Sequence, residues 1–222
     1  MKIEDVLVVA VHPDDETLGC GGTLLRYKAE GHRLHWLVLT GDAGFIQDEA
    51  LLARRHRQVE RVRERYGFDG CHFLDHPSTQ LDRVGHDILI RSISTVFTQV
   101  QPTIVFLPYR QDVHSDHRIA FETAFACTKS FRYPSIEKVY MMEVLSETEF
   151  SADPGGFLPN VFFDISAHLD KKIEILKEYE TEMGQHPFPR SERNLRALAT
   201  FRGAMAGVDS AEAFMLIREF VR

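Results

Sequence analysis

Two short polar segments of the chain hold enough ligand and proton-transfer groups to build a catalytic site. The first, His12-Pro13-Asp14-Asp15-Glu16, places an imidazole and three carboxylates within five residues. Adjacent carboxylates repel each other, and a nearby cation relieves that repulsion. Capping of a following helix would explain one or two of the acids, but not the histidine that precedes them. The segment therefore favours a metal site over capping alone.

The second segment is Asp112-Val113-His114-Ser115-Asp116-His117. Its two histidines lie three residues apart, so both rings can project to one side of a helix start. With His12 and Asp15, either histidine completes a set of three ligands that leaves a fourth position for water, as in catalytic zinc sites. Zinc suits this set better than magnesium, which prefers oxygen ligands, while iron, manganese and cobalt remain alternatives.

Short apolar runs alternate with helical periodicity along the chain, which is typical of a parallel α/β sheet. The runs predict strands at 6–11, 35–40, 72–74, 103–107, 139–145 and 161–165. The periodicity predicts helices at 17–30, 48–66, 87–100 and 117–131, and a mostly helical remainder from residue 168 onward. We therefore expect one domain over residues 1–222, a three-layer Rossmann-like α/β sandwich around a mainly parallel sheet.

The predicted topology brings the two polar segments together independently of their chemistry. Ligands of such sheets bind beyond the C-terminal ends of the strands, where the strand order reverses, commonly between the first and fourth strands. The first predicted strand ends at Val11, directly before His12, and the fourth ends at Leu107, shortly before Asp112. Both segments are therefore expected at the same edge of the sheet.

Composition excludes several classes of protein. A net charge of −7 with neutral histidines disfavours nucleic-acid binding. Cys20, Cys71 and Cys127 are odd in number and widely spaced, which favours a reducing compartment. No apolar run approaches the roughly 20 residues of a membrane span, and no secretory signal is visible. We expect a cytoplasmic protein without a membrane span.

The motifs resemble those of the PIG-L (N-acetylglucosaminyl-phosphatidylinositol de-N-acetylase) or LmbE-like family of metal-dependent sugar deacetylases. The most specific are the segments at 12–16 and 114–117. Further similar segments occur at 40–44, 163–166, 202–203 and 211–214, so the resemblance covers nearly the whole chain.

The resemblance implies a role for each residue of the two segments. It makes three residues the metal ligands, namely His12, Asp15 and His117. Asp14 would be the general base, and His114 would stabilise the oxyanion or protonate the leaving amine. Asp116 is expected to hold an imidazole in one tautomer or to cap the following helix.

Substrate contacts follow less directly from the motifs. In the family an arginine twelve residues before the glycine that ends the second helix contacts the sugar, and counting back from Gly67 gives Arg55. Arg54 and Arg57 are close alternatives. Ser78 stands where the family usually has an acid after the third strand, which suggests a different substrate.

The resulting hypothesis is a zinc-dependent N-deacetylase that releases acetate from an N-acetylated amino sugar or its glycoconjugate. One alternative is a metal-dependent amidase acting on another glycoside or thiol-glycoside. A second is a nucleotide- or sugar-binding α/β module without catalysis, since a fold does not determine function. The resemblance also implies a homo-oligomer.

Overall fold

The computed structural model describes residues 2–42 and 46–221. The strands are β1 (Asp5–Ala10), β2 (Arg33–Gly41), β3 (Gly70–Pro77), β4 (Ile104–Pro108), β5 (Lys138–Met142), β6 (Val161–Asp164) and β7 (Ala211–Glu219). The helices are α1 (Asp15–Ala29), α2 (Glu49–Tyr66), α3 (His86–Val100), α4 (Ser115–Ala126), α5 (Leu169–Leu176) and α6 (Glu192–Ala206), with a short 3₁₀ turn at Leu81–Arg83. Residues 43 and 44 of the predicted 40–44 motif lie outside the described residues.

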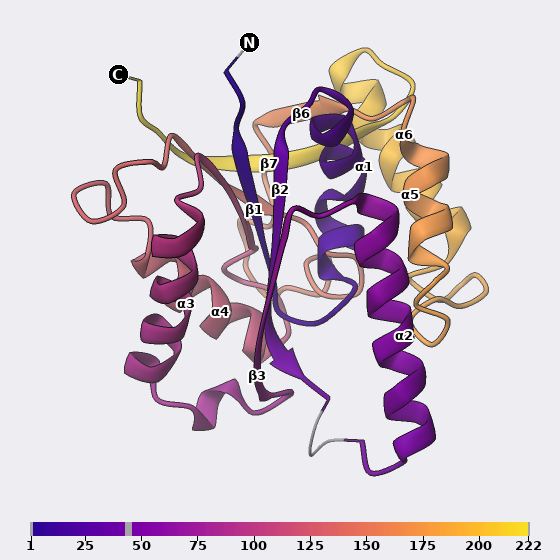
Figure 1. Ribbon diagram of the computed structural model, residues 1–222. Coiled ribbons are helices and arrows are strands. Elements are labelled where there is room, and N and C mark those ends of the chain that lie inside the picture. The colour runs from indigo at the N-terminus through magenta and orange to yellow at the C-terminus, as the bar shows by residue number, and fades with distance from the viewer. Residues whose placement is uncertain (1, 43–45, 222) are drawn as a thin grey trace.

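The strands form one seven-stranded sheet in the order β3-β2-β1-β4-β5-β7-β6. Strands β1 to β5 are parallel to one another, and β7 runs antiparallel to both β5 and β6. Helices α3 and α4 cover one face, while α1, α2, α5 and α6 lie on the other (Figure 1). The predicted three-layer sandwich is confirmed, and the strand order reverses between β1 and β4, as expected from the sequence.

Strand β1 is buried on both faces, which explains its continuous apolar sequence. Successive side chains of a strand point to opposite faces. Val6 and Val8 accordingly pack in the core beneath α1 and α2, whereas Leu7 and Val9 pack beneath α3 and α4. The strand thus delivers the residues that follow it to a rigid position at the edge of the sheet.

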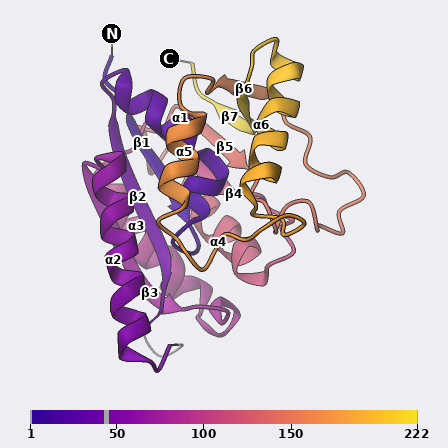
Figure 2. The ribbon, with the colours of Figure 1, turned by 90° about the vertical axis from the view of Figure 1, so that its right-hand side faces the viewer.

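The C-terminal region differs from its prediction. Residues 211–219, expected to be helical, form β7 between β5 and β6 (Figure 2). A short apolar run does not reveal by its periodicity whether it is a buried strand or part of a helix. Here β5 and β6 offer hydrogen-bonding edges, and Phe214 is fully buried between them.

Helix boundaries were predictable where capping groups mark them. Asp48 caps α2 by accepting from the N–H groups of Ala50 and Leu51, and Gly67 ends it in the left-handed conformation with φ of 65°.

The predicted end of one helix is wrong. Helix α4 ends at Ala126 rather than at the predicted residue 131.

The glycine-rich part of α1 permits close packing. A Cβ atom on Gly19 would lie 2.6 Å from Sδ of Met142, and one on Gly22 would lie 2.8 Å from Cδ1 of Ile165. Between them the helix is broken at Cys20, whose φ of −143° and ψ of 19° are not helical. The segment therefore packs closely against its neighbours, and Cys20 divides α1 into two shorter helical halves.

A buried ion pair joins the two halves of α1. The N–H groups of Gly22 and Thr23, at the start of the second half, donate to the two carboxylate oxygens of Glu212 at 2.8 and 2.7 Å. Lys172 of α5 donates to the same carboxylate at 2.6 Å and to the carbonyl oxygen of Leu18 at 2.9 Å. Because this contact unites α1, α5 and β7, we call Lys172 and Glu212 the splice pair.

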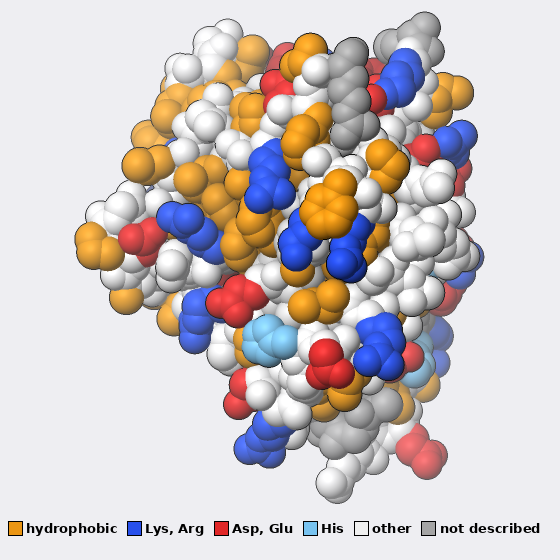
Figure 3. All heavy atoms as spheres, turned by 90° about the vertical axis from the view of Figure 1, so that its left-hand side faces the viewer, with side chains coloured by type: hydrophobic (Ala, Val, Ile, Leu, Met, Phe, Trp, Pro, Cys, Tyr) orange, Lys and Arg blue, Asp and Glu red, His pale blue; other side chains and the backbone are white. Residues whose placement is uncertain are grey.

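The surface carries charges of both signs. On the face over α3 and α4, basic and acidic side chains are interspersed with apolar ones (Figure 3). Of the helices in residues 2–42 and 46–221, none combines the length and the hydropathy that crossing a membrane requires.

Candidate metal centre and active site

The two polar segments meet beyond the C-terminal ends of the paired strands β1 and β4. The first forms the turn into α1, and the second forms the start of α4. Together they line a cavity of about 220 Å³, which we call the metal cavity. Every residue predicted for the site lines it except Asp116.

Ligand atoms of His12, Asp15 and His117 lie within 4.8 Å of one another. Nε2 of His117 is 3.5 Å from Oδ2 of Asp15, and Nδ1 of His12 is 4.0 Å from the same oxygen. The N–H groups of Val11 and His12 donate to this oxygen at 2.8 and 2.9 Å and hold the carboxylate in place. Two imidazoles and one carboxylate match the protein ligands of catalytic zinc, so the residues present fit a divalent metal ion.

A second set shares His12. Ligand atoms of His12, His114 and Asp116 also lie within 4.8 Å of one another, with Nε2 of His12 at 3.6 Å from Oδ2 of Asp116. The distances therefore leave either His114 or His117 able to share a metal with His12. The surroundings of the two histidines differ, and they favour His117.

The ring of His117 is held by the carboxylate of Asp112, a residue of the second segment to which the sequence assigned no role. Nδ1 of His117 lies 2.8 Å from Oδ2 of Asp112, which is fully buried. The hydroxyl of Thr148 donates to the other oxygen of Asp112 at 2.6 Å. Such a carboxylate fixes the ring orientation of a metal-binding histidine and leaves Nε2 for the metal.

Asp116 lies next to an imidazole, as one of its two predicted roles requires, and it also holds a loop. Its carboxylate accepts from the N–H groups of Thr79 and Leu81 at 2.7 and 3.1 Å, which anchors the loop after β3. The imidazole that it approaches is that of His12, at 3.6 Å. The capping alternative is wrong, because the N-cap of α4 is His114.

Electrostatic interactions couple the candidate ligand residues. Burial by itself lowers the pKa of an imidazole, but the carboxylates of Asp15 and Asp112 outweigh it and raise the pKa of His117 to about 9. Burial likewise opposes the charge on Asp15, yet His117 and His12 lower the pKa of that carboxyl below its usual value. A divalent cation would take the place of the proton on His117, so metal binding is expected to release protons.

Asp14 lies beside the ligands in a strained backbone conformation. Its φ of 136° is one that non-glycine residues rarely adopt. Its N–H donates to Oε2 of Glu16 at 3.1 Å, and its carboxylate pairs with Arg190 at 3.2 Å. Burial, together with the charge of Asp15, raises the pKa of Asp14 well above its ordinary range, although Arg190 opposes this. A buried carboxyl with a raised pKa beside a metal site has the properties of a general base.

Glu16, the last residue of the first segment, faces the interior. It accepts hydrogen bonds from the hydroxyls of Thr17 and Tyr179 at 2.6 and 2.9 Å, besides the N–H of Asp14. Burial raises the pKa of Glu16 to about 7. Its contacts show that it positions the backbone of Asp14.

His114 is suited to donating a hydrogen bond. Its Nδ1 accepts from the N–H of Asp116 at 3.1 Å. Burial, followed by the proximity of His12, lowers the pKa of His114 to about 4, so the ring is neutral near pH 7. A neutral imidazole that accepts at Nδ1 carries its proton at Nε2.

Arg55 is the arginine of α2 that lines the metal cavity. Its guanidinium donates to Asp42 at 2.7 Å and to Glu182 at 3.1 Å. Arg54 instead pairs with a glutamate at the surface, and Arg57 is exposed. The structure thus separates the three arginines that the sequence left as alternatives.

Other residues of the metal cavity were not found from the sequence. Arg190 and Glu182 come from the segment between α5 and α6 and pair with each other at 3.1 Å. Glu147 also lines the cavity, where burial raises its pKa. The sequence assigned no role to these residues, because their distance along the chain from His12 and Asp15 leaves no periodic signal that would place them in the cavity.

A protein-family profile matches the chain. The profile of the family described as PIG-L, GlcNAc-PI de-N-acetylase, matches residues 7–128, a stretch that includes both polar segments. Among curated proteins, a diacetylchitobiose deacetylase of Thermococcus kodakarensis is 26% identical over 227 residues. That alignment covers 97% of this chain and 84% of the relative.

Solved structures share the fold over nearly the full length. The conserved protein TT1542 from Thermus thermophilus is 27% identical with a TM-score of 0.79, and the match covers 99% of this chain and 97% of that one. GalB, the 4-carboxy-2-hydroxymuconate hydratase of Pseudomonas putida, is 20% identical, also with a TM-score of 0.79, over 99% of this chain and 98% of its own. This second likeness concerns the fold alone.

Proposed function

The chain belongs to the PIG-L family, whose profile matches more than half of it, and from this premise we propose that it is a zinc-dependent N-deacetylase. Its substrate would be an N-acetylated amino sugar or a glycoconjugate of one, and its products acetate and the free amine. One observation carries the proposal. The ligand atoms of His12, Asp15 and His117 converge within 4.8 Å beside the buried carboxyl of Asp14.

Zinc is supported by the donor set and by the bracing of one ligand. Two imidazoles with a single carboxylate suit zinc better than magnesium, and Asp112 holds His117 as carboxylates hold zinc-bound histidines. A bound zinc ion would supply an acidified water and a polarised carbonyl. His12, Asp15 and His117 would hold it.

Asp14 would act as the general base. It accepts a proton from the attacking water as the new C–O bond forms at the amide carbon. The same proton passes to the nitrogen as the C–N bond breaks, so the sugar leaves as an amine and the acyl group as acetate. Arg190, paired with this carboxylate, and Glu16, bonded to its N–H, would keep Asp14 in position.

His114 would stabilise the carbonyl oxygen as negative charge develops on it. The neutral ring donates through Nε2, because Nδ1 already accepts the N–H of Asp116. Loss of one such donor typically reduces kcat about 10²- to 10³-fold. Arg55, which lines the cavity and is fixed by Asp42 and Glu182, would contact hydroxyl groups of the sugar ring.

The test is acetate release from a panel of N-acetylated sugars by zinc-loaded protein. Asp14→Asn should retain stoichiometric zinc, measured by mass spectrometry, and lose about 10²- to 10⁴-fold in kcat. Asp87→Asn, on the exposed part of α3, is the matched control and should behave as the wild type. Near-normal turnover of Asp14→Asn would overturn the base assignment.

The same panel separates the alternatives. Cleavage of other glycosides or thiol-glycosides without action on N-acetyl sugars would indicate a different amidase. Binding of sugars by protein that takes up no metal would indicate a non-catalytic module. A cytoplasmic location and a homo-oligomer stay predictions, which fractionation and light scattering would check.

A further inference from the structure

Three carboxylates and two arginines alternate along the wall of the metal cavity, and all five side chains line it. Arg190 pairs with Asp14 at 3.2 Å and with Glu182 at 3.1 Å. Arg55 pairs with the same Glu182 at 3.1 Å and with Asp42 at 2.7 Å. We call these five residues the charge chain. Its middle member, Glu182, connects the proposed base to the proposed sugar-binding arginine.

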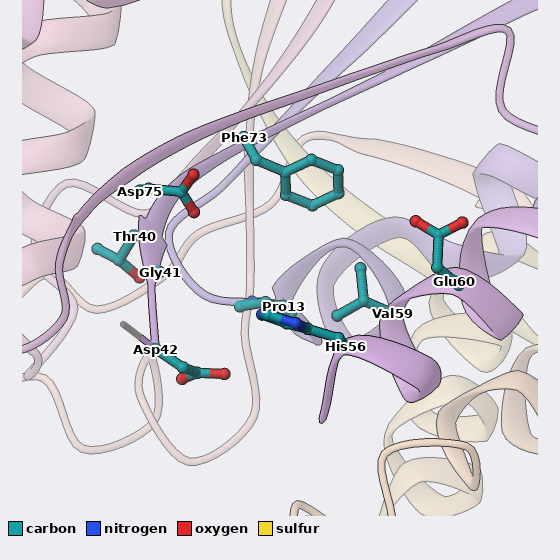
Figure 4. A pocket seen from close by; sticks show the side chains of 9 residues that line it. All are labelled: Pro13, Thr40, Gly41, Asp42, His56, Val59, Glu60, Phe73 and Asp75. Carbon is teal, nitrogen blue, oxygen red and sulfur yellow. The ribbon is translucent and has the colours of Figure 1, made fainter. Parts of the chain in front are cut away.

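The charge chain is attached to rigid parts of the fold. Asp42 directly follows β2, and Figure 4 shows it at the end of that strand, where it lines a neighbouring cavity of about 340 Å³ together with His56 of α2. Glu182 comes three residues after Tyr179, whose buried hydroxyl donates to Glu16 at 2.9 Å. The segment that carries Glu182 is therefore anchored to the start of α1.

Arg190 contacts the proposed base at a single oxygen. Its Nη1 donates to Oδ2 of Asp14 at 3.2 Å, while Nη2 pairs with Oε2 of Glu182 at 3.1 Å. Its Nε is buried and has no hydrogen-bond partner among the described residues. An arginine beside a carboxylate commonly donates to both of its oxygens. Because Glu182 engages Nη2, Arg190 leaves Oδ1 of Asp14 available for the proton of the attacking water.

The other oxygen of Glu182 holds Arg55. Nη1 of Arg55 donates to Oε1 of Glu182 at 3.1 Å, and Nε donates to Asp42 at 2.7 Å. These two hydrogen bonds leave Nη2 for a hydroxyl of the substrate. Since a guanidinium is planar, two fixed points also fix the direction of its remaining donors. Without Glu182, Arg55 would be held by Asp42 alone and could turn about that contact.

On the basis of the proposed deacetylase function, we propose that Glu182 is a positioning residue that supports catalysis and substrate binding at once. Through Arg190 it keeps one oxygen of Asp14 free to accept the proton. Through Arg55 it keeps a donor directed at the sugar ring. Each oxygen of its carboxylate serves one of these arginines, so a single side chain influences both kcat and KM.

The test compares three alanine variants in acetate release from the sugar that the wild type cleaves fastest. Glu182→Ala should decrease kcat about 10- to 100-fold and raise KM about 3- to 10-fold. Asp42→Ala, which removes a partner of Arg55 but none of Arg190, should raise KM and leave kcat as in the wild type. Glu180→Ala, the matched control, removes a carboxylate that pairs with surface arginines of α2 and should change neither constant.

An Arg190→Ala background tests whether the effect on kcat passes through this arginine. Adding Glu182→Ala there should leave kcat unchanged and still raise KM through Arg55. A further decrease in kcat would overturn the positioning role, and so would wild-type constants in the single variant Glu182→Ala. Each variant should retain one zinc per chain by mass spectrometry. Loss of zinc from Glu182→Ala would instead mean that Glu182 supports the metal centre.

Crystal structures of the wild type and of Glu182→Ala separate this inference from the proposed function. In the variant, Arg190 should donate to both oxygens of Asp14. If the wild type releases no acetate from any sugar but the variant shows this double contact, the deacetylase function fails and the positioning role of Glu182 stands. If Arg190 keeps its single contact in the variant, the positioning role is overturned whether or not acetate is released.

Discussion

Two buried charged clusters lie along α1, and they differ in how their charges are used. In the splice pair, the ammonium of Lys172 donates to Glu212 and to the carbonyl oxygen of Leu18, and both carboxylate oxygens of Glu212 accept backbone N–H groups. In the metal cluster at the start of the helix, ligand atoms of His12, Asp15 and His117 converge on a cavity.

The splice pair uses buried charge to hold the structure together, whereas the metal cluster presents buried charged groups to a cavity. Burying a charge is unfavourable unless partners satisfy it. The splice pair is satisfied within the protein and joins a broken helix, α5 and β7. In the metal cluster, Asp112 satisfies Nδ1 of His117 and leaves Nε2 of that ring directed at the other two residues of the cluster.

Removal of a metal ligand should have the largest effect. His117→Ala takes away one of the three proposed metal ligands and leaves Asp15 without its main cationic neighbour. We expect loss of stoichiometric zinc and a decrease in kcat/KM of more than about 10³-fold. Mass spectrometry and acetate release measure these effects. A variant that keeps one zinc per chain and normal turnover would show that this cluster is not the metal centre.

Disruption of the splice pair should reduce stability without changing the chemistry. Lys172→Met leaves the buried carboxylate of Glu212 unpaired, which should cost about 3–5 kcal/mol in the free energy of unfolding. Urea denaturation measures this cost, and the folded fraction should still bind one zinc. The double variant with Glu212→Gln should recover part of the loss. A single variant as stable as the wild type would show that Lys172 does not stabilise the buried carboxylate of Glu212.

Asp112→Asn, which changes the hydrogen-bond partner of His117, should have a smaller effect, a decrease in zinc affinity. The amide cannot brace Nδ1 of His117 as the carboxylate does. Zinc affinity should fall about 10- to 100-fold, as is typical when such a partner is changed. Competition with a chromophoric chelator measures the affinity, with Asp87→Asn as a control. Unchanged affinity would mean that the hydrogen bond to His117 does not support the metal.

The smallest effect concerns the pH dependence of stability. The pKa of Glu16 is raised by burial to about 7, so its contribution to stability is present at low pH and is lost as the pH rises through 7. Between pH 6 and pH 8 the wild type should lose about 1 kcal/mol more than Glu16→Gln. Urea denaturation of chelator-treated proteins at both pH values gives this double difference. Equal losses would show that Glu16 stays ionised in the folded chain.

Local sequence signals predicted most of the parallel part of the sheet, its helices and the residues at the centre of the site. The strand before His12 is apolar on both faces because both are covered. Helix α2 begins directly after Asp48 and ends directly before Gly67, because these two residues cap it. The two polar segments were placed at one edge by the order of strands and helices. These features depend on periodicity and capping within a few residues.

The tertiary structure alone decided how the rest of the site is built. Residues 211–219 became a strand because β5 and β6 offered edges to it, and Glu212 thereby reached the break in α1. Arg190 meets Asp14 across 176 positions of sequence, and Asp112 rather than Asp116 braces His117. Sequence periodicity reports on neighbours within a turn or two, whereas the partner of a buried charge depends on which distant segment the packing of the sheet and helices brings to it.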